Sequence, residues 1–176
     1  MRLHLIALLL LPVLFSVQAV TTPDKTPASA QQAATNAGQE ETPDQRADLE
    51  QGIKHVLISQ IEAWNHGNLD GFMQGYWHSP DLTFFSGATV TRGWEPTLLR
   101  YRQRYQAEGK EMGKLDFQGL KIDLLSSRSA VVTGQWQLTL SNNKTPDGKQ
   151  PHGLFTLIFK RMPAGWKIVH DHTSAE

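Results

Sequence analysis

The sequence contains no cysteine among its 176 residues. This absence excludes disulfide bonds, thiol catalysis and zinc–thiolate sites. An excess of one charge is also missing, because 17 Lys and Arg residues balance 17 Asp and Glu residues. A balanced chain has no general attraction to nucleic acid or to an anionic membrane. We therefore expect no nucleic acid among its partners.

The sequence also has no apolar run that is long enough to span a membrane as a helix. Leu3–Val17 is almost continuously apolar, but it is shorter than the ~20 residues that a spanning helix needs. Arg2 precedes this run, and Val17-Gln18-Ala19 has the small residues of a cleavage site. We therefore predict a signal peptide over residues 1–19 and a secreted or periplasmic protein that has no membrane contact after cleavage. The alternative is a retained membrane anchor.

Large apolar residues are scarce between residues 20 and 41, where Ala, Gln, Thr and Pro dominate. Such a segment cannot bury enough surface to offset the entropy that ordering it would cost. We predict a flexible linker over residues 20–41. Residues 42–176, which carry all the clear helix and strand patterns, form the predicted folded domain.

The sequence has no phosphate-binding glycine loop, no nucleophile elbow and no dinucleotide fingerprint. Neither a cofactor nor a metal is therefore predicted. His170 and His172 could face one metal ion together, but a site usually needs a third protein ligand. His152, Glu95 or His78 could supply that ligand, although nothing in their spacing requires it.

Three helices are predicted at the start of the domain. Thr42-Pro43-Asp44-Gln45 has the pattern of a capping box with proline at the first helical position. Apolar residues then recur every three or four positions as far as Trp64, and Gly67 is a suitable end. Asn68 can cap a short second helix, and a third is predicted over residues 94–105.

Alternating apolar residues predict strands in the rest of the domain. A phase shift near Gly119-Leu120 predicts a β-bulge, and Trp136, in the middle of a clean alternation, is predicted to be buried. Helices followed by consecutive antiparallel strands predict an α+β fold with the helices on one sheet face. The predicted strands are 82–86, 89–92, 115–125, 130–140, 153–161 and 166–173.

The last strand places Trp166, Ile168, His170 and His172 on one face if it alternates regularly. An apolar interior that gives way to imidazoles is typical of a pocket floor. Because histidine titrates near neutral pH, His170 and His172 are the predicted catalytic residues. The two rings could instead hydrogen-bond within a closed interior. Asp171 alternates to the opposite face and could orient a histidine only from an edge.

Four segments resemble the SnoaL-like branch of the nuclear transport factor 2-like superfamily. They are Ala63-Trp64-Asn65-His66-Gly67-Asn68-Leu69-Asp70, Pro80-Asp81-Leu82-Thr83-Phe84, Arg92-Gly93 and the closing Gly165–Ser174. The closing segment is also similar to that of the calmodulin kinase II association domain. The resemblance implies a cone-shaped, cystatin-like α+β fold, with N-terminal helices packed on a strongly curved, mainly antiparallel sheet. It further implies an internal cavity and, often, a homodimer.

In such a fold the cavity mouth would lie near the third helix and the end of the last strand. Arg92 could bind a ligand carboxylate, or it could only pair with Asp81 or Glu95. The aromatic residues could form the pocket wall or simply belong to the core. The residues predicted to bind the ligand are Arg92, Trp94, Tyr101, Trp64 and Tyr76.

The predicted function is an exported single-domain protein with a pocket for a small-molecule ligand, compatible with isomerase-, hydrolase- or lyase-type chemistry. Ketosteroid isomerases of this superfamily use a helix tyrosine and a strand aspartate, and the resemblance places Gln60 and Ser86 at those positions. Neither side chain can perform the required role, so that activity is not expected. The alternative is a non-catalytic module that dimerises or docks a protein partner through its sheet.

Overall fold

The computed structural model describes residues 41–141 and 150–175. The predicted signal peptide and all of the predicted linker except Glu41 lie outside these ranges. None of the helices within them is long and apolar enough to cross a membrane.

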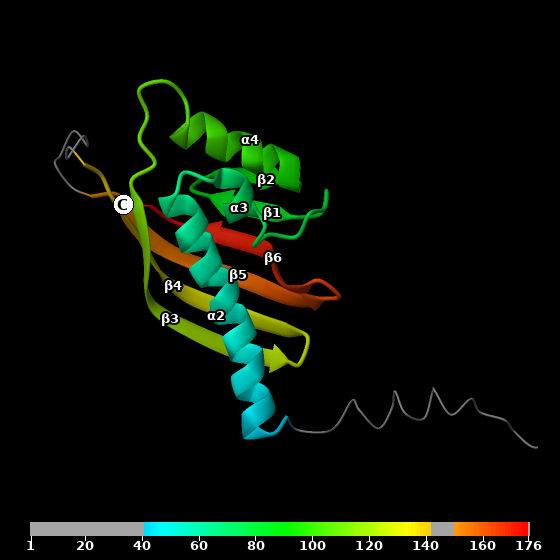
Figure 1. Cartoon of the computed structure of the whole chain (residues 1–176). Coiled ribbons are helices and arrows are strands. Elements are labelled where there is room, and N and C mark those ends of the chain that lie inside the picture. Colours follow the sequence, from blue (N-terminus) through cyan, green and yellow to red (C-terminus); the bar gives the residue numbers. More distant parts are fainter. Residues whose placement is uncertain (1–40, 142–149, 176) are drawn as a thin grey trace, which may run out of the picture. The chain divides into compact units, whose positions relative to one another are not determined.

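Three helices and six strands make up the described domain, which confirms the predicted α+β class (Figure 1). The helices are α2 (Pro43–Asn65), α3 (Leu69–Met73) and α4 (Trp94–Tyr105). The strands are β1 (Thr83–Ser86), β2 (Thr89–Arg92), β3 (Lys114–Ser126), β4 (Ser129–Thr139), β5 (His152–Met162) and β6 (Gly165–Thr173).

The helix starts follow from local sequence. The Thr42 hydroxyl accepts a hydrogen bond from the Gln45 backbone N–H at 3.3 Å, and the Gln45 side chain accepts one from the Thr42 N–H at 2.9 Å. This reciprocal pair is the predicted capping box. The Asn68 side chain likewise accepts a hydrogen bond from the Gly71 N–H at 2.8 Å and caps α3. Both predicted caps are therefore confirmed.

The six strands form one sheet in the order β2-β1-β6-β5-β4-β3. Every neighbouring pair is antiparallel except β1 and β6, which run parallel. Helix α2 lies across one face of the sheet, and α4 lies beyond α3 near β1 and β2 (Figure 1). Fully buried residues from helix and sheet meet in the core between them; they include Ile53, Met73, Leu82, Phe159 and Ile168.

The predicted β-bulge in β3 is confirmed. The register with β4 shifts between Gln118 and Lys121, and Gly119 has a φ of 60°. Glycine adopts this left-handed conformation without the steric cost that a side chain would bring. The phase change in the sequence was therefore a reliable sign of the irregularity.

A bulge in β6 reverses the expected faces of its C-terminal half. Phe159 pairs with Ile168 and Ile158 pairs with His170, so Val169 is an extra residue. The inward side chains are therefore Trp166 and Ile168 before the bulge but Asp171 after it. An extra residue in a strand shifts its period-2 alternation by one position.

The partners of β6 change at this bulge. Before it, Ile168 exchanges backbone hydrogen bonds with Gly75 and Trp77, both at 2.9 Å. From His170 onward, β6 pairs with β1, beginning at Thr83. The bulge therefore lies where one neighbouring segment gives way to the next, and this long-range change is not encoded in the local alternation of β6.

Candidate functional site

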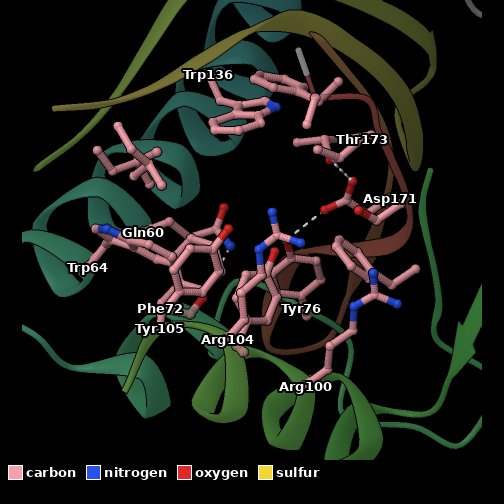
Figure 2. Close-up of a pocket in the computed structure, with 18 of the residues that line it drawn as sticks. Gln60, Trp64, Phe72, Tyr76, Arg100, Arg104, Tyr105, Trp136, Asp171 and Thr173 are labelled. Carbon is pink, nitrogen blue, oxygen red and sulfur yellow. Dashed lines mark hydrogen bonds between the residues drawn. The ribbon is translucent and has the colours of Figure 1, made fainter. Parts of the chain in front are cut away.

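A cavity opens between the helices and the inward face of the sheet, and its space is about 770 Å³ including the solvent at its mouth. Most of its wall is aromatic or aliphatic, and polar side chains project into it from both layers (Figure 2). Such a wall with a few polar groups is typical of a small-molecule site. The apolar wall includes Trp64, Phe72, Phe84, Leu138, Phe155 and Leu157.

Asp171 provides a buried carboxyl group in this cavity. Its Oδ2 accepts a hydrogen bond from the Tyr76 hydroxyl at 2.7 Å, and its Oδ1 accepts one from the Thr173 hydroxyl at 2.7 Å. Burial raises the pKa of Asp171 to about 6, against the opposing effects of these two hydrogen bonds and of His172. A carboxyl group with this pKa can both accept and donate a proton near neutral pH.

Two tyrosines supply hydroxyl groups next to this carboxyl. Burial, followed by the negative charge of Asp171, raises the pKa of Tyr76 well above its usual range. The same two causes raise the pKa of Tyr101. Both phenols therefore stay protonated at neutral pH and can donate hydrogen bonds.

Three of the five predicted ligand-binding residues, Trp64, Tyr76 and Tyr101, line the cavity. The other two do not. Trp94 is buried elsewhere, where its indole N–H donates to the Met73 carbonyl at 2.9 Å, and Arg92 is exposed on β2. The structure therefore brings together three of the four predicted aromatic residues and leaves out Trp94 and the predicted cation.

The expected position of His170 and His172 in the cavity is wrong, because the β6 bulge turns both to the opposite sheet face. There the His170 Nδ1 lies 2.6 Å from the Thr83 hydroxyl. Both imidazoles also pack edge-on against Phe85, with ring centroids 5.0 and 6.0 Å away. Burial, and then the charge of His172, lowers the pKa of His170. The geometric reason for assigning catalysis to this pair is therefore lost.

Sequence reasoning missed the polar residues that take their place. Asp171 was assigned to the outer face because the bulge was not foreseen. Arg100 and Arg104 line the cavity from α4, and neither was among the residues predicted to bind the ligand. Their spacing of four residues, with tyrosines at 101 and 105, was the available signal, since residues four apart share a helix face.

Trp136 is only partly buried, so the prediction of a buried indole is wrong. Its ring lines the cavity, and its N–H donates to the Ser174 carbonyl at 2.9 Å. We expect Trp136→Ala to lower the free energy of unfolding by roughly 1–3 kcal/mol, less than the ~3–5 kcal/mol expected for the fully buried Phe159→Ala. Urea denaturation of the two variants checks this order. A larger loss for Trp136→Ala would contradict it.

Metal ligands are not gathered anywhere in the described ranges, since no three His, Asp or Glu side chains cluster there. The cavity carries one carboxyl, three phenols and two guanidinium groups. The carboxyl can transfer protons, the phenols can donate hydrogen bonds, and the guanidinium groups can bind an anion.

The sequence matches the SnoaL-like domain family over residues 53–176, and the chain belongs to this family. A solved NTF-2-like protein of unknown function from Shewanella oneidensis MR-1 shares 35% identity, with 71% of this chain and 98% of that chain covered and a TM-score of 0.62. No curated protein matches the sequence.

More distant structures show the same fold. A cystatin-like fold protein from Burkholderia xenovorans LB400 has 21% identity and a TM-score of 0.54, with 76% of this chain and 93% of that chain covered. A putative calcium/calmodulin-dependent protein kinase type II association domain from Thiobacillus denitrificans ATCC 25259 has 18% identity and a TM-score of 0.57, with 70% and 94% covered. The predicted superfamily and cystatin-like fold are thereby confirmed, but no activity follows from them.

Proposed function

We propose that this domain binds a small, largely apolar molecule in its cavity and exchanges a proton with it through Asp171. The observation that carries the proposal is the presence of one buried carboxyl inside an open, mainly aromatic cavity. A domain that served only to dock a partner through its sheet would have no need of such a cavity. An open cavity therefore favours ligand binding over the docking alternative.

The apolar wall can supply most of the binding free energy. Burying about 200 Å² of ligand surface contributes roughly 5 kcal/mol, partly offset by the lost motion of the ligand. Phe72 and Phe155 come from helix and sheet respectively and both line the cavity, so they can contact a flat ligand from two layers. We expect dissociation constants in the micromolar to millimolar range for simple aromatic ligands.

Asp171 supplies the chemistry of the proposal. With a pKa of about 6, it is mainly a carboxylate at neutral pH and can take a proton from a bound carbon or oxygen acid. The Tyr76 hydroxyl at 2.7 Å holds the carboxylate in place, and Tyr101 lines the same cavity with a protonated phenol that can stabilise developing negative charge. Such an arrangement suits isomerase- or lyase-type proton transfer.

Ketosteroid isomerase activity is not part of the proposal. Gln60 and Ser86 both line the cavity, yet neither can act as an acid or a base near neutral pH. Gln60 is held by a hydrogen bond from its amide Nε2 to the Phe72 carbonyl at 3.1 Å. The carboxyl group of this cavity instead comes from β6.

The binding step can be tested with N-phenylnaphthylamine, a neutral dye whose fluorescence rises in apolar surroundings. Ser86→Phe places a ring inside the cavity, and we expect it to weaken binding about tenfold or more, which corresponds to at least ~1.4 kcal/mol. Val90→Phe adds the same ring at an exposed position of the same hairpin and should leave binding unchanged. Equal binding by both variants would contradict a site in the cavity.

A further inference from the structure

Helix α4 carries three arginines whose surroundings differ. Arg102 is neutralised by Asp70, with its Nη2 2.9 and 2.8 Å from the two carboxylate oxygens. Arg100 and Arg104 lie four residues apart, on the helix face that borders the cavity. Among the described residues, no carboxylate forms an ion pair with either of them. Two of the three cations are therefore available to a ligand.

Both cavity arginines are held against aromatic rings. The Arg100 guanidinium carbon lies 5.4 Å from the centre of the Phe84 ring, and that of Arg104 lies 5.5 Å from the centre of the Tyr105 ring. The Arg100 Nη1 also donates to the Thr91 hydroxyl at 3.1 Å. These contacts restrict the side chains, so less entropy is lost when a guanidinium group binds an anion.

The two signs of charge in the cavity come from different layers. Arg100 and Arg104 extend from α4 toward the cavity, whereas Asp171 comes from the sheet (Figure 2). The Asp171 oxygens accept hydrogen bonds from Tyr76 and Thr173, and in the described part of the chain neither arginine forms an ion pair with this carboxyl. A ligand could therefore meet both signs of charge at once.

We propose that the cavity selects molecules with an apolar body and one oxyanion group, a carboxylate or a sulfonate, which Arg100 and Arg104 bind. This inference rests on the proposed function, since it names the ligand class of the same cavity. It also sets the orientation of the ligand. The anionic group lies beside α4, where guanidinium groups can form paired hydrogen bonds with it. The apolar body points toward Asp171, because the charge of this carboxylate would repel an anion.

Two dyes with closely related ring systems test this class of ligand. Anilinonaphthalene sulfonate is anionic, and N-phenylnaphthylamine is its neutral counterpart. We expect the protein to bind the anionic dye about tenfold more tightly than the neutral one, and added salt to reduce the difference. Arg104→Gln should remove most of this preference without changing the affinity for the neutral dye more than about twofold.

Arg102→Gln is the matched control, because it removes the same charge from the same helix at a position outside the cavity. It should leave both affinities unchanged, while Arg100→Gln should act like Arg104→Gln. Arg104→Lys keeps the charge without the planar fork and should give an intermediate loss. Thermal unfolding of each variant confirms that it is folded.

The possible failures are distinguishable. If both dyes bind, Ser86→Phe blocks them, and neither arginine change alters their ratio, the ligand class is wrong and the cavity site stands. If Arg102→Gln changes the ratio as much as Arg104→Gln does, the preference reflects general helix charge and the inference is overturned. If neither dye binds, or if Ser86→Phe has no effect, the proposed function fails and the inference fails with it.

Discussion

Replacing Trp64 with alanine is expected to lower the free energy of unfolding by ~3–5 kcal/mol. The indole is 3% exposed and packs edge-on against Phe72 and Tyr105, with ring centroids 5.1 and 4.8 Å away. Its N–H donates to the carbonyls of Met112 and Gly113 at 3.3 and 3.1 Å, just before β3. The substitution removes these two hydrogen bonds from α2 and leaves a void in the core.

Urea denaturation measures this loss. Trp64→Phe retains an aromatic ring without the indole N–H, and we expect it to cost less than Trp64→Ala. A loss below about 1 kcal/mol for the alanine variant would mean that α2 is not packed as described. Because Trp64 also lines the cavity, dye binding should weaken in the alanine variant even where the protein remains folded.

Replacing Asp171 with asparagine is expected to stabilise the protein at high pH. The folded-state pKa of about 6 lies above the ordinary value of 3.8, so the folded protein holds this proton more tightly than the unfolded chain. The charged carboxylate therefore costs ~3 kcal/mol of stability above pH 6, and this cost declines as the pH falls toward 4. Asparagine keeps the shape of the side chain and its ability to hydrogen-bond with Tyr76 and Thr173.

The free energy of unfolding should be measured for both proteins between pH 4 and pH 8. We expect Asp171→Asn to be more stable by up to ~3 kcal/mol at pH 8 and nearly equal to the parent at pH 4. Asp81→Asn makes the same change at an exposed position and serves as the matched control. A variant that is less stable at pH 8, or a difference that does not depend on pH, would contradict the raised pKa. If the Asp171→Asn variant is more stable but no longer exchanges a proton with its ligand, the Asp171 carboxyl serves function at a cost in stability.

Local sequence was sufficient to predict the parts of the fold that local interactions determine. The Thr42 capping box and the Asn68 cap each involve residues three positions apart, so their sequence patterns already contain the interaction. The bulge at Gly119 could be predicted because its phase change is visible in one strand and glycine suits its positive φ. Long-range packing was not needed for any of these predictions.

The faces of β6 could not be predicted in this way. The spacing of Trp166, Ile168, His170 and His172 fits a regular strand, whereas the bulge at Val169 coincides with the change of partner from Gly75–Trp77 to β1. This change depends on segments about ninety residues away in the sequence. The wrong assignment of the β6 faces also made the predicted site wrong. A shift of one residue in β6 places the Asp171 carboxyl in the cavity and turns His170 and His172 to the opposite face.

The charges of the site were missed for a related reason. Arg100, Arg102 and Arg104 look alike in the sequence, but Arg102 meets Asp70 and the other two border the cavity. Only the packing of α4 against the rest of the domain separates them. Trp136 was placed on the correct inward face, but how much of it is covered depends on the neighbouring C-terminal segment at Ser174.

The most direct test of the account is a crystal structure of the protein in complex with anilinonaphthalene sulfonate. We predict that the dye rings lie in the cavity against Phe72 and Phe155, and that the sulfonate contacts Arg100 and Arg104. Asp171 should face the rings from β6. A dye bound only on the outer sheet face, beside His170 and His172, with no occupant in the cavity, would contradict the account.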